Sequence, residues 1–196
     1  ETAALPPVLL LKPLHGGEAL LEAALASACT QDHPNYRIVC GVQDAGDPAI
    51  AVVRRVQARF PATDLRLVID ATPHGRNRKV ENLINALAAH PPADPGEVVV
   101  IADSDMHTPP DWLRRVVATL AQPGVGLVTT VYTGLAAVPG PVAQLGCTAL
   151  AHTFLPGVLL ARAMGRQDCL GATMALRADT LAAIGGLAAL LPHLAD

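Results

Sequence analysis

Aromatic and charged residues are both scarce in this chain of 196 residues. Phe, Trp and Tyr make up 3% of the sequence, Asp, Glu, Lys and Arg together make up 16%, and the formal net charge is -3. A protein that binds nucleic acid needs a basic patch to neutralise phosphates, and often aromatic rings on which bases stack. The composition therefore argues against a nucleic-acid partner. Hydrophobic residues make up 51% of the chain, which is enough for one compact domain with a sizeable core.

Cysteine is also rare, and none of the four cysteines forms a C-x-x-C pair. This argues against a zinc site and against a thioredoxin-like motif. We therefore expect reduced, mostly buried thiols at Cys29, Cys40, Cys147 and Cys169. We also expect no signal peptide, because Glu1 lies close to the first predicted strand.

No uninterrupted apolar run reaches the roughly 18 to 20 residues that a membrane-spanning helix needs. Even so, residues 116–161 contain no Asp, Glu, Lys or Arg. Prolines interrupt this stretch at positions 123, 139, 141 and 156, so we expect that it does not span a bilayer. The favoured interpretation is a buried strand followed by a core helix, since apolar residues usually lie in the core. The alternative is a surface that rests on a membrane or receives an apolar acceptor.

Short apolar runs alternate with segments of helical periodicity along most of the chain. Strands are predicted at residues 8–11, 36–42, 65–69, 98–102, 125–131 and 170–176, and helices at 18–28, 49–60, 79–89, 111–120 and 177–184. Residues 141–164 are expected to be helical in parts. The alternation predicts an α/β fold with right-handed crossovers and a largely parallel, doubly wound sheet. Ligands of such sheets bind beyond the carboxyl ends of the strands, so the polar residues that follow each strand are site candidates.

The strongest candidate follows the strand at 98–102, where Asp103 and Asp105 flank Ser104. Residues two apart in an extended segment point to the same side, so both carboxylates can converge on one ligand. Such hard oxygens suit Mg²⁺ or Mn²⁺, which commonly bridge one or two carboxylates and substrate phosphates. Turn formation and helix capping are the alternative explanation for this Asp-Ser-Asp sequence.

Asp44 follows the strand at 36–42 in the same way. Its carboxylate could accept a hydrogen bond from a base or a ribose hydroxyl, and capping explains it equally well. The nearby Asp47 precedes Pro48 and is more simply a helix N-cap.

A basic cluster, HGRNRKVEN at residues 74–82, lies at the start of the helix predicted at 79–89. Backbone N–H groups and the helix dipole already favour anions there, so cations oppose the dipole unless an anion is bound. A bound diphosphate resolves this conflict, with Lys79 as the point charge. The alternative is a solvated and slightly unfavourable helix start.

Residues 12–18, with the sequence KPLHGGE, follow the first strand. Their glycines lack the G-x-G-x-x-G spacing and no G-K-[ST] follows, which argues against a dinucleotide fingerprint and a P-loop. The loop could instead hold a base through its backbone.

With these four loops in place, the sequence resembles the ceramide glucosyltransferase group of inverting glycosyltransferases. Within that group it is most similar to the bacterial hopanoid-biosynthesis-associated glycosyltransferases. The matching stretches cover nearly the whole chain in order: LLKPLHGGE, YRIVCGVQDAGDPAIAVVRRVQARFP, HGRNRKVENLINAL, IADSDMHTPPDWLRRVV, GLVTTVYTG and GRQDCLGATMALRADTLAAIGGL. The resemblance implies a single GT-A catalytic core, Rossmann-like with a mostly parallel mixed sheet. Residues 1–131 would form its nucleotide-sugar-binding half and residues 132–196 its acceptor half.

The resemblance also implies a UDP-sugar donor, a divalent cation and a membrane-lipid acceptor. Asp44 matches the aspartate of the uridine pocket. Asp103 and Asp105 match the D-x-D pair, with Asp105 the better candidate metal ligand. Lys79 and Asn82 match the motif that closes near the donor. The first loop contributes further candidates for donor binding, namely Lys12, Pro13, Leu14 and Glu18.

The match is incomplete at its end, where the chain stops at Asp196. Asp196 matches only the first acid of a family pair whose second acid is expected to act as the catalytic base. The family's Q-x-x-R-W motif and flanking membrane helices are absent from this sequence. We therefore expect a soluble fragment of a parent protein that lies on the cytoplasmic face of the bacterial inner membrane. Residues 171–173 match the strand beside the acceptor site.

Together these features predict an inverting enzyme that moves a sugar from a UDP-sugar to a lipid hydroxyl. The resemblance points to N-acetylglucosamine as the sugar and a hopanoid polyol as the acceptor. The cation would neutralise the departing diphosphate and a carboxylate would take the acceptor proton. The alternatives are a ceramide glucosyltransferase, a nucleotidyltransferase, and a UDP-sugar-binding module without activity.

Overall fold

The computed structural model of the protein describes residues 5–192. In chain order its elements are β1 (Val8–Pro13), α1 (Leu21–Cys29), β2 (Tyr36–Val42), α2 (Ala49–Arg59), β3 (Leu65–Ile69), α3 (Arg78–Ala89), β4 (Val98–Ala102), α4 (Trp112–Leu120), β5 (Val128–Thr129), α5 (Pro141–Ala163), β6 (Thr173–Arg177), α6 (Ala178–Ala183) and the 3-10 helix η1 (Leu187–Leu190).

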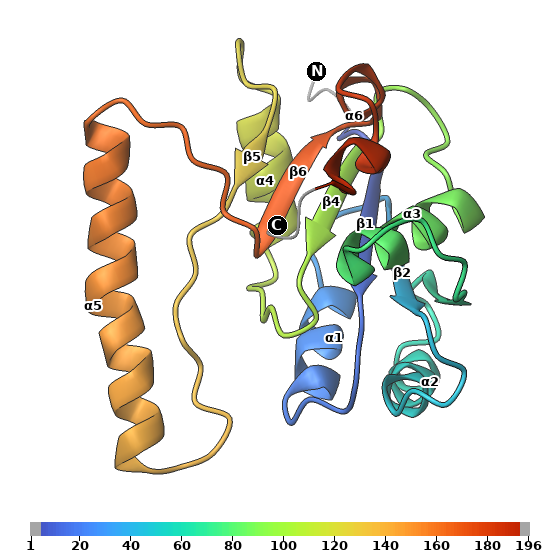
Figure 1. Ribbon diagram of the computed structural model, residues 1–196, viewed down its shortest axis with the longest axis horizontal. Coiled ribbons are helices and arrows are strands. Elements are labelled where there is room, and N and C mark those ends of the chain that lie inside the picture. The colour runs from blue at the N-terminus through green and yellow to red at the C-terminus, as the bar shows by residue number, and fades with distance from the viewer. Residues whose placement is uncertain (1–4, 193–196) are drawn as a thin grey trace.

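Six strands form one mixed sheet in the order β3-β2-β1-β4-β6-β5 (Figure 1). β1 to β4 run parallel, and β6 runs antiparallel to β4 and to β5. Each of the first three strands is followed by a helix that returns the chain, which is the connection that parallel pairing requires. The predicted mostly parallel α/β sheet is therefore confirmed. Its parallel order brings the carboxyl ends of β1, β2 and β4 to one edge.

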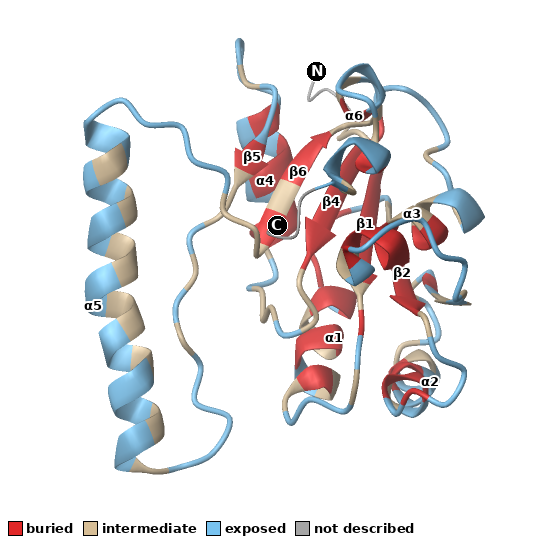
Figure 2. Cartoon of the chain, in the orientation of Figure 1, coloured by how far each residue is buried: buried red, intermediate tan, exposed pale blue. Residues whose placement is uncertain are grey.

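Helices cover both faces of this sheet. α1, α2 and α4 pack on one face through residues such as Leu25, Val53 and Leu113. α3 and α6 pack on the other face through Leu83 and Leu181. The strands between these layers are mostly buried (Figure 2), as their continuous apolar runs predict.

The edge strand β5 is shorter than predicted. The prediction of a strand over 125–131 is wrong in extent, because only Val128 and Thr129 pair with β6. β5 lies at the outer edge and has a neighbour on one side only, so no second strand extends its ladder. The chain then leaves the sheet, and Val131 is 50% exposed. Strand β6 begins at Thr173, opposite the end of β4 at Ala102, and so starts three residues later than predicted.

α5 departs furthest from the sequence-based expectation. It is one continuous helix of 23 residues that contains Pro156, and none of its residues is buried. The favoured interpretation of this stretch as a core helix is therefore wrong. Its apolar residues surround the helix instead of forming one stripe, so it offers no single face to a core. In the described part of the chain it is the one helix that is long and apolar enough to cross a membrane.

α5 contacts the rest of the protein through the extended segment 130–139 that precedes it (Figure 1). The rings of Tyr132 and Phe154 lie with their centroids 4.5 Å apart. A Cβ added at Gly134 would stand 2.8 Å from the Cα of Cys147. The segment therefore approaches the helix backbone closely at a residue that has no side chain.

All four cysteines are free, as predicted. Cys29 and Cys40 are buried, while Cys147 is partly exposed and Cys169 is exposed. The expectation of mostly buried thiols therefore holds for the two cysteines of the sheet and its packed helices, and not for the other two, which lie in α5 and in the loop after it.

α3 approaches β2 most closely at Gly41. The Asn82 side-chain amide donates hydrogen bonds to the backbone oxygens of Gly41, at 2.9 Å, and of Leu14, at 3.3 Å. A Cβ at position 41 would lie 2.1 Å from Asn82 Oδ1 and 3.3 Å from the Cβ of Ala86. We expect Gly41→Ala to lower the free energy of unfolding by about 1–3 kcal/mol, the usual cost of overpacking a core. Urea denaturation measures this change.

Gly146→Ala is the matched control, because a Cβ at position 146 in α5 would have no atom within 4 Å apart from the neighbouring backbone of its own helix. Alanine is the better helix former by about 1 kcal/mol, so this variant should not be less stable than the wild type. An unchanged urea midpoint in Gly41→Ala would show that the α3–β2 contact is looser than the structure indicates.

Candidate functional site

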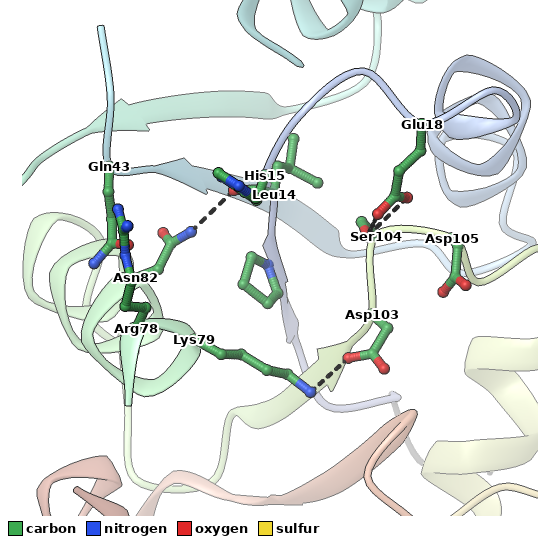
Figure 3. A pocket seen from close by; sticks show the side chains of 11 residues that line it. Leu14, His15, Glu18, Gln43, Arg78, Lys79, Asn82, Asp103, Ser104 and Asp105 are labelled. Carbon is green, nitrogen blue, oxygen red and sulfur yellow. Dashed lines mark hydrogen bonds and ion pairs between the residues drawn. The ribbon is translucent and has the colours of Figure 1, made fainter. Parts of the chain in front are cut away.

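A cleft of about 400 Å³ opens at the carboxyl edge of the sheet (Figure 3). We call it the inner cleft. The loops after β1, β2 and β4 and the first turns of α3 supply its lining, which consists of Pro13, Leu14, His15, Glu18, Gln43, Arg78, Lys79, Asn82, Asp103, Ser104 and Asp105. The cleft therefore forms where the parallel strand order gathers three loops that are distant in sequence.

Hydrogen bonds hold the loop after β4 through its backbone and through a side chain. The N–H of Asp103 donates to the oxygen of Ala172 at 3.1 Å, which ties the loop to the residue before β6. The Ser104 hydroxyl donates to the carboxylate of Glu18, at 3.0 and 3.1 Å from its two oxygens. The carboxylates of Glu18, Asp103 and Asp105 consequently gather on one side of the inner cleft (Figure 3).

The buried side chain of Lys12 supports the loop after β4 from inside the protein. Its side chain is almost wholly buried, with 2% of the residue exposed, and its Nζ donates to the backbone oxygen of Asp103 at 2.7 Å. Burial lowers the pKa of Lys12 to about 8, and nearby acidic groups, including Asp103, Asp105 and Glu18, oppose this shift. At neutral pH the ammonium therefore remains mostly charged and places a positive charge beneath the acidic loop.

The first turn of α3 brings positive charge to the opposite side of the inner cleft. Asn77 caps the helix by accepting a hydrogen bond from the N–H of Val80 at 3.1 Å. Lys79 Nζ lies 2.8 Å from Asp103 Oδ1 (Figure 3). Arg78 Nε donates to Gln43 Oε1 at 3.2 Å. The predicted basic cluster therefore does open a helix, and an acidic partner offsets the unfavourable placement of Lys79 near the positive end of the dipole.

Glu81 fixes the loop that leads into α3. One oxygen of its carboxylate accepts from the N–H groups of His74 and Gly75, at 2.6 and 2.7 Å, and the other accepts from Gln43 Nε2 at 3.3 Å. The hydrogen bonds from Gly75 and His74 lower the pKa of Glu81 below its ordinary value. The anionic carboxylate thus joins this loop to the loop after β2.

A second hollow, which we call the outer cleft, has a volume of about 1100 Å³. It shares Glu18, Asp103 and Asp105 with the inner cleft, so the two meet at the acidic residues. Beyond them its lining is mainly apolar and comes from the loop after β4, from α4, from the segment 130–137 and from α5; it includes Leu20, Met106, Trp112, Val131, Leu135, Leu150 and Leu155.

Most of the residues singled out from the sequence lie together in the inner cleft, namely Pro13, Leu14, Glu18, Lys79, Asn82, Asp103 and Asp105. Lys12 does not line either cleft and lies beneath the inner one. Asp44 is exposed and outside the lining, where its carboxylate accepts from the N–H of Gly46 at 2.8 Å. Its predicted role at a uridine stays a prediction. Asp196 lies outside the described residues.

Four residues of the inner cleft were not among the predicted site residues: His15, Gln43, Arg78 and Ser104. Each is a direct sequence neighbour of a predicted site residue. The available signal was the position in a loop after a strand for His15, Gln43 and Ser104, and the basic start of α3 for Arg78. Asp47 was predicted to be an N-cap, but the N-cap position of α2 is Pro48. The Asp47 carboxylate instead accepts from the N–H of Ala49, two residues further on, at 2.8 Å. It also accepts from the N–H of Gly16, which ties the first loop to α2.

The donor set suits a hard divalent cation that shares its coordination with a ligand. Among residues 5–192, we find no metal-site arrangement made of three or more His, Cys, Asp or Glu side chains. Mg²⁺ and Mn²⁺ do not require one, because they commonly use one or two carboxylates together with substrate phosphates and water. The ion pair of Lys79 with Asp103 Oδ1 indicates that positive charge is favourable beside this carboxylate.

The fold and the site together define the class of the protein. The structure is similar to a mannosyltransferase from Pyrobaculum calidifontis solved with GDP-Man and Mn²⁺, with a TM-score of 0.70 and 25% identity over 94% of this chain and 48% of that one. It also matches glucosyl-3-phosphoglycerate synthase from Mycobacterium tuberculosis, with a TM-score of 0.56 and 19% identity over 89% of this chain and 57% of that one. The chain has the GT-A glycosyltransferase fold.

A model of the family described as glycosyl transferase family 21 matches residues 1–196, and the chain belongs to this family. Among curated proteins it is similar to a ceramide glucosyltransferase from Komagataella phaffii, with 31% identity over 97 residues, 45% of this chain and 19% of the relative. It is also similar to ceramide glucosyltransferase 1 from Caenorhabditis elegans, with 29% identity over 117 residues, 59% of this chain and 24% of the relative. The matched region thus spans a quarter or less of these relatives.

The lowered pKa of Glu81 predicts a pH-dependent contribution to stability. The unfolded chain binds a proton at this group more readily than the folded protein does, so the contribution is present above the ordinary pKa of 4.5. It is lost as the pH falls from there through the lower pKa of the folded state. We expect Glu81→Gln to be less stable than the wild type at pH 7, and the difference between them to shrink as the pH is lowered below 4.5.

Urea midpoints at several pH values measure this difference. Glu22→Gln is the control, because Glu22 is an exposed partner of Arg55 far from the loop. A stability difference for Glu81→Gln that stays constant with pH would show that its carboxylate does not hold the loop as an anion.

Proposed function

We propose that this protein is the catalytic core of an inverting glycosyltransferase that moves a sugar from a UDP-sugar to the hydroxyl group of a membrane lipid. The observation that carries the proposal is the meeting of two clefts of different chemistry at Glu18, Asp103 and Asp105. The inner cleft is polar and bears both signs of charge, while the outer cleft is mainly apolar. A charged donor and an apolar acceptor can therefore meet at the same carboxylates.

The inner cleft supports the donor part of this proposal. Lys79 and Arg78 lie at the start of α3, where backbone N–H groups and the helix dipole also attract anions. A diphosphate placed here faces the carboxylates of Asp103 and Asp105 across the cleft. A divalent cation bound between these carboxylates and the diphosphate would neutralise the charge that develops on the leaving group.

Sugar transfer with inversion also needs a base for the acceptor hydroxyl. We assign this step to a carboxylate of the acidic pair that Asp196 matches, as the resemblance to the ceramide glucosyltransferase group implies. The described residues contribute by positioning, because Lys12 and Ser104 hold the acidic loop and Asn82 holds the first loop against β2. Such preorganisation is a large part of catalysis when charge moves onto a leaving group.

The outer cleft and α5 support a lipid acceptor. No residue of α5 is buried, apolar residues such as Val142, Leu145 and Leu160 are exposed, and residues 116–161 carry no Asp, Glu, Lys or Arg. A bilayer interface can cover such exposed apolar residues along the whole length of the helix. Leu150 and Leu155 of α5 also line the outer cleft, so a lipid at this helix lies next to the acidic residues.

Two donor and acceptor pairs follow from the comparisons and from the sequence. The resemblance to hopanoid-associated enzymes points to UDP-N-acetylglucosamine and a hopanoid polyol. The names of the curated relatives point to glucose as the sugar and ceramide as the acceptor, and the proposed UDP-sugar donor would then be UDP-glucose. Assays of both pairs with the full-length protein separate them. Binding of UDP without turnover of either pair would favour a binding module, and release of diphosphate from a nucleoside triphosphate would favour a nucleotidyltransferase.

Metal-dependent nucleotide binding tests the donor part of the proposal. We expect the wild-type chain to bind UDP more tightly with Mn²⁺ than without it, because the cation joins the diphosphate to the carboxylates. Asp105→Ala should weaken UDP binding in the presence of Mn²⁺ by a factor of at least about 10, because one of the two carboxylates is lost. Isothermal titration calorimetry with and without Mn²⁺ measures the gain.

Asp168→Ala is the matched control, since Asp168 is an exposed acid that pairs with Arg166 outside both clefts. It should keep the full gain from Mn²⁺. If Asp105→Ala binds UDP and Mn²⁺ as the wild type does, the metal lies elsewhere and the assigned site is wrong.

Association with lipid vesicles tests the acceptor part of the proposal. We expect the wild-type chain to float with vesicles of phosphatidylcholine and phosphatidylglycerol. The double variant Leu145→Asp/Leu160→Asp should bind at least about tenfold less, because it places charges among exposed apolar residues of α5. Leu145 and Leu160 are 68% and 63% exposed.

Ile184→Asp is the control for added charge, because Ile184 is a similarly exposed apolar residue, at 59%, and lies beyond the end of α6. It should leave flotation unchanged. Equal flotation of the double variant and the wild type would show that α5 is not the part of the chain that contacts the bilayer.

A further inference from the structure

Lys79 lies between the two charged partners that the inner cleft is expected to hold. Its Nζ is 2.8 Å from Asp103 Oδ1, and the two side chains are only 23% and 32% exposed. Its backbone belongs to the first turn of α3, where N–H groups and the dipole attract an anion. One ammonium can therefore reach a carboxylate suited to a metal and a helix end suited to a diphosphate.

The contact with Asp103 has a consequence for metal binding. An ammonium 2.8 Å from Oδ1 occupies the space in which a cation bound to that oxygen would lie. A divalent cation that uses this oxygen must displace Lys79 or share the carboxylate with it. Sharing is unfavourable because like charges at such short range repel, and more strongly where solvent screening is reduced.

We propose that Lys79 couples metal binding to nucleotide binding by exchanging partners. Without nucleotide, its ammonium competes with the divalent cation for Asp103. When a diphosphate enters, Lys79 moves onto the phosphate oxygens and leaves Asp103 to the cation. The nucleotide thereby tightens metal binding, and by thermodynamic reciprocity the metal tightens nucleotide binding by the same factor. The inference rests on the proposed function, because it takes the diphosphate of a nucleotide sugar as the ligand.

Arg78 provides a matched control for the charge of Lys79. It lies in the same turn of α3 and lines the same cleft, but its guanidinium bonds to the neutral Gln43 instead of to Asp103. Removing either residue takes one positive charge away from the cleft. Only the removal of Lys79 frees the carboxylate oxygen. The two variants therefore distinguish direct competition of Lys79 with the cation for Asp103 from a general change in the electrostatic potential of the cleft.

The experiment measures Mn²⁺ binding to the 196-residue chain by electron paramagnetic resonance, with and without saturating UDP. In the absence of UDP, we expect Lys79→Met to bind Mn²⁺ more tightly than the wild type, by a factor of roughly 3 to 10, as removal of a partly buried ion-pair competitor implies. Arg78→Met should change this affinity by less than about twofold, because the Arg78 guanidinium bonds to Gln43 and blocks neither carboxylate. UDP should tighten Mn²⁺ binding less in Lys79→Met than in the wild type.

The sign of the change decides the outcome, since a residue that only supports the fold or the metal site would weaken Mn²⁺ binding when it is removed. Unchanged or weaker Mn²⁺ binding in Lys79→Met overturns the inference, and so does an equal increase in Arg78→Met. Lys79→Gln repeats the test with a second neutral side chain, and thermal unfolding checks that the variants fold. A wild type that binds UDP independently of Mn²⁺ overturns the proposed function itself, so the two failures are distinguishable.

Discussion

The site depends on the parallel pairing of β1 with a strand on each side. Leu10 pairs with Ile38 of β2 and with Val100 of β4, and this register sets the three carboxyl ends at one edge. Because the loops that follow these strands are about 30 to 90 residues apart in sequence, only the sheet brings them together. The apolar runs that make the strands therefore determine where the acidic loop faces the basic turn of α3.

Buried polar contacts then fix the loops that the sheet has gathered. Lys12, Asn82 and Glu81 are each almost fully buried, and each uses its side chain to hold the backbone of a different loop. A buried polar group is costly unless it is hydrogen-bonded, so these side chains favour one arrangement of the loops over looser ones. The cleft is thus preorganised around a group of carboxylates that repel one another, with the ammonium groups of Lys12 and Lys79 beside them.

The sequence predicted those parts of the structure that depend on local pattern. The continuous apolar runs of β1 and β4 and the polar residues just after them were sufficient to locate Asp103, Asp105 and Glu18 at one edge. The exposed position of α5 was not predictable in the same way, because an apolar helix has the same sequence pattern whether protein or lipid covers it. The buried position of Lys12 and the ion pair between Lys79 and Asp103 were also missed, since both depend on contacts across more than 20 residues of sequence.

A cation and a diphosphate that meet at the loop after β4 are central to the proposed chemistry. The most direct measurement is anomalous X-ray diffraction at the manganese edge from crystals of the protein grown with UDP and Mn²⁺. We expect one anomalous peak within coordination distance of Asp105, with the diphosphate between it and the first turn of α3. A peak at another place, or UDP bound with no anomalous peak beside its diphosphate, would contradict this expectation.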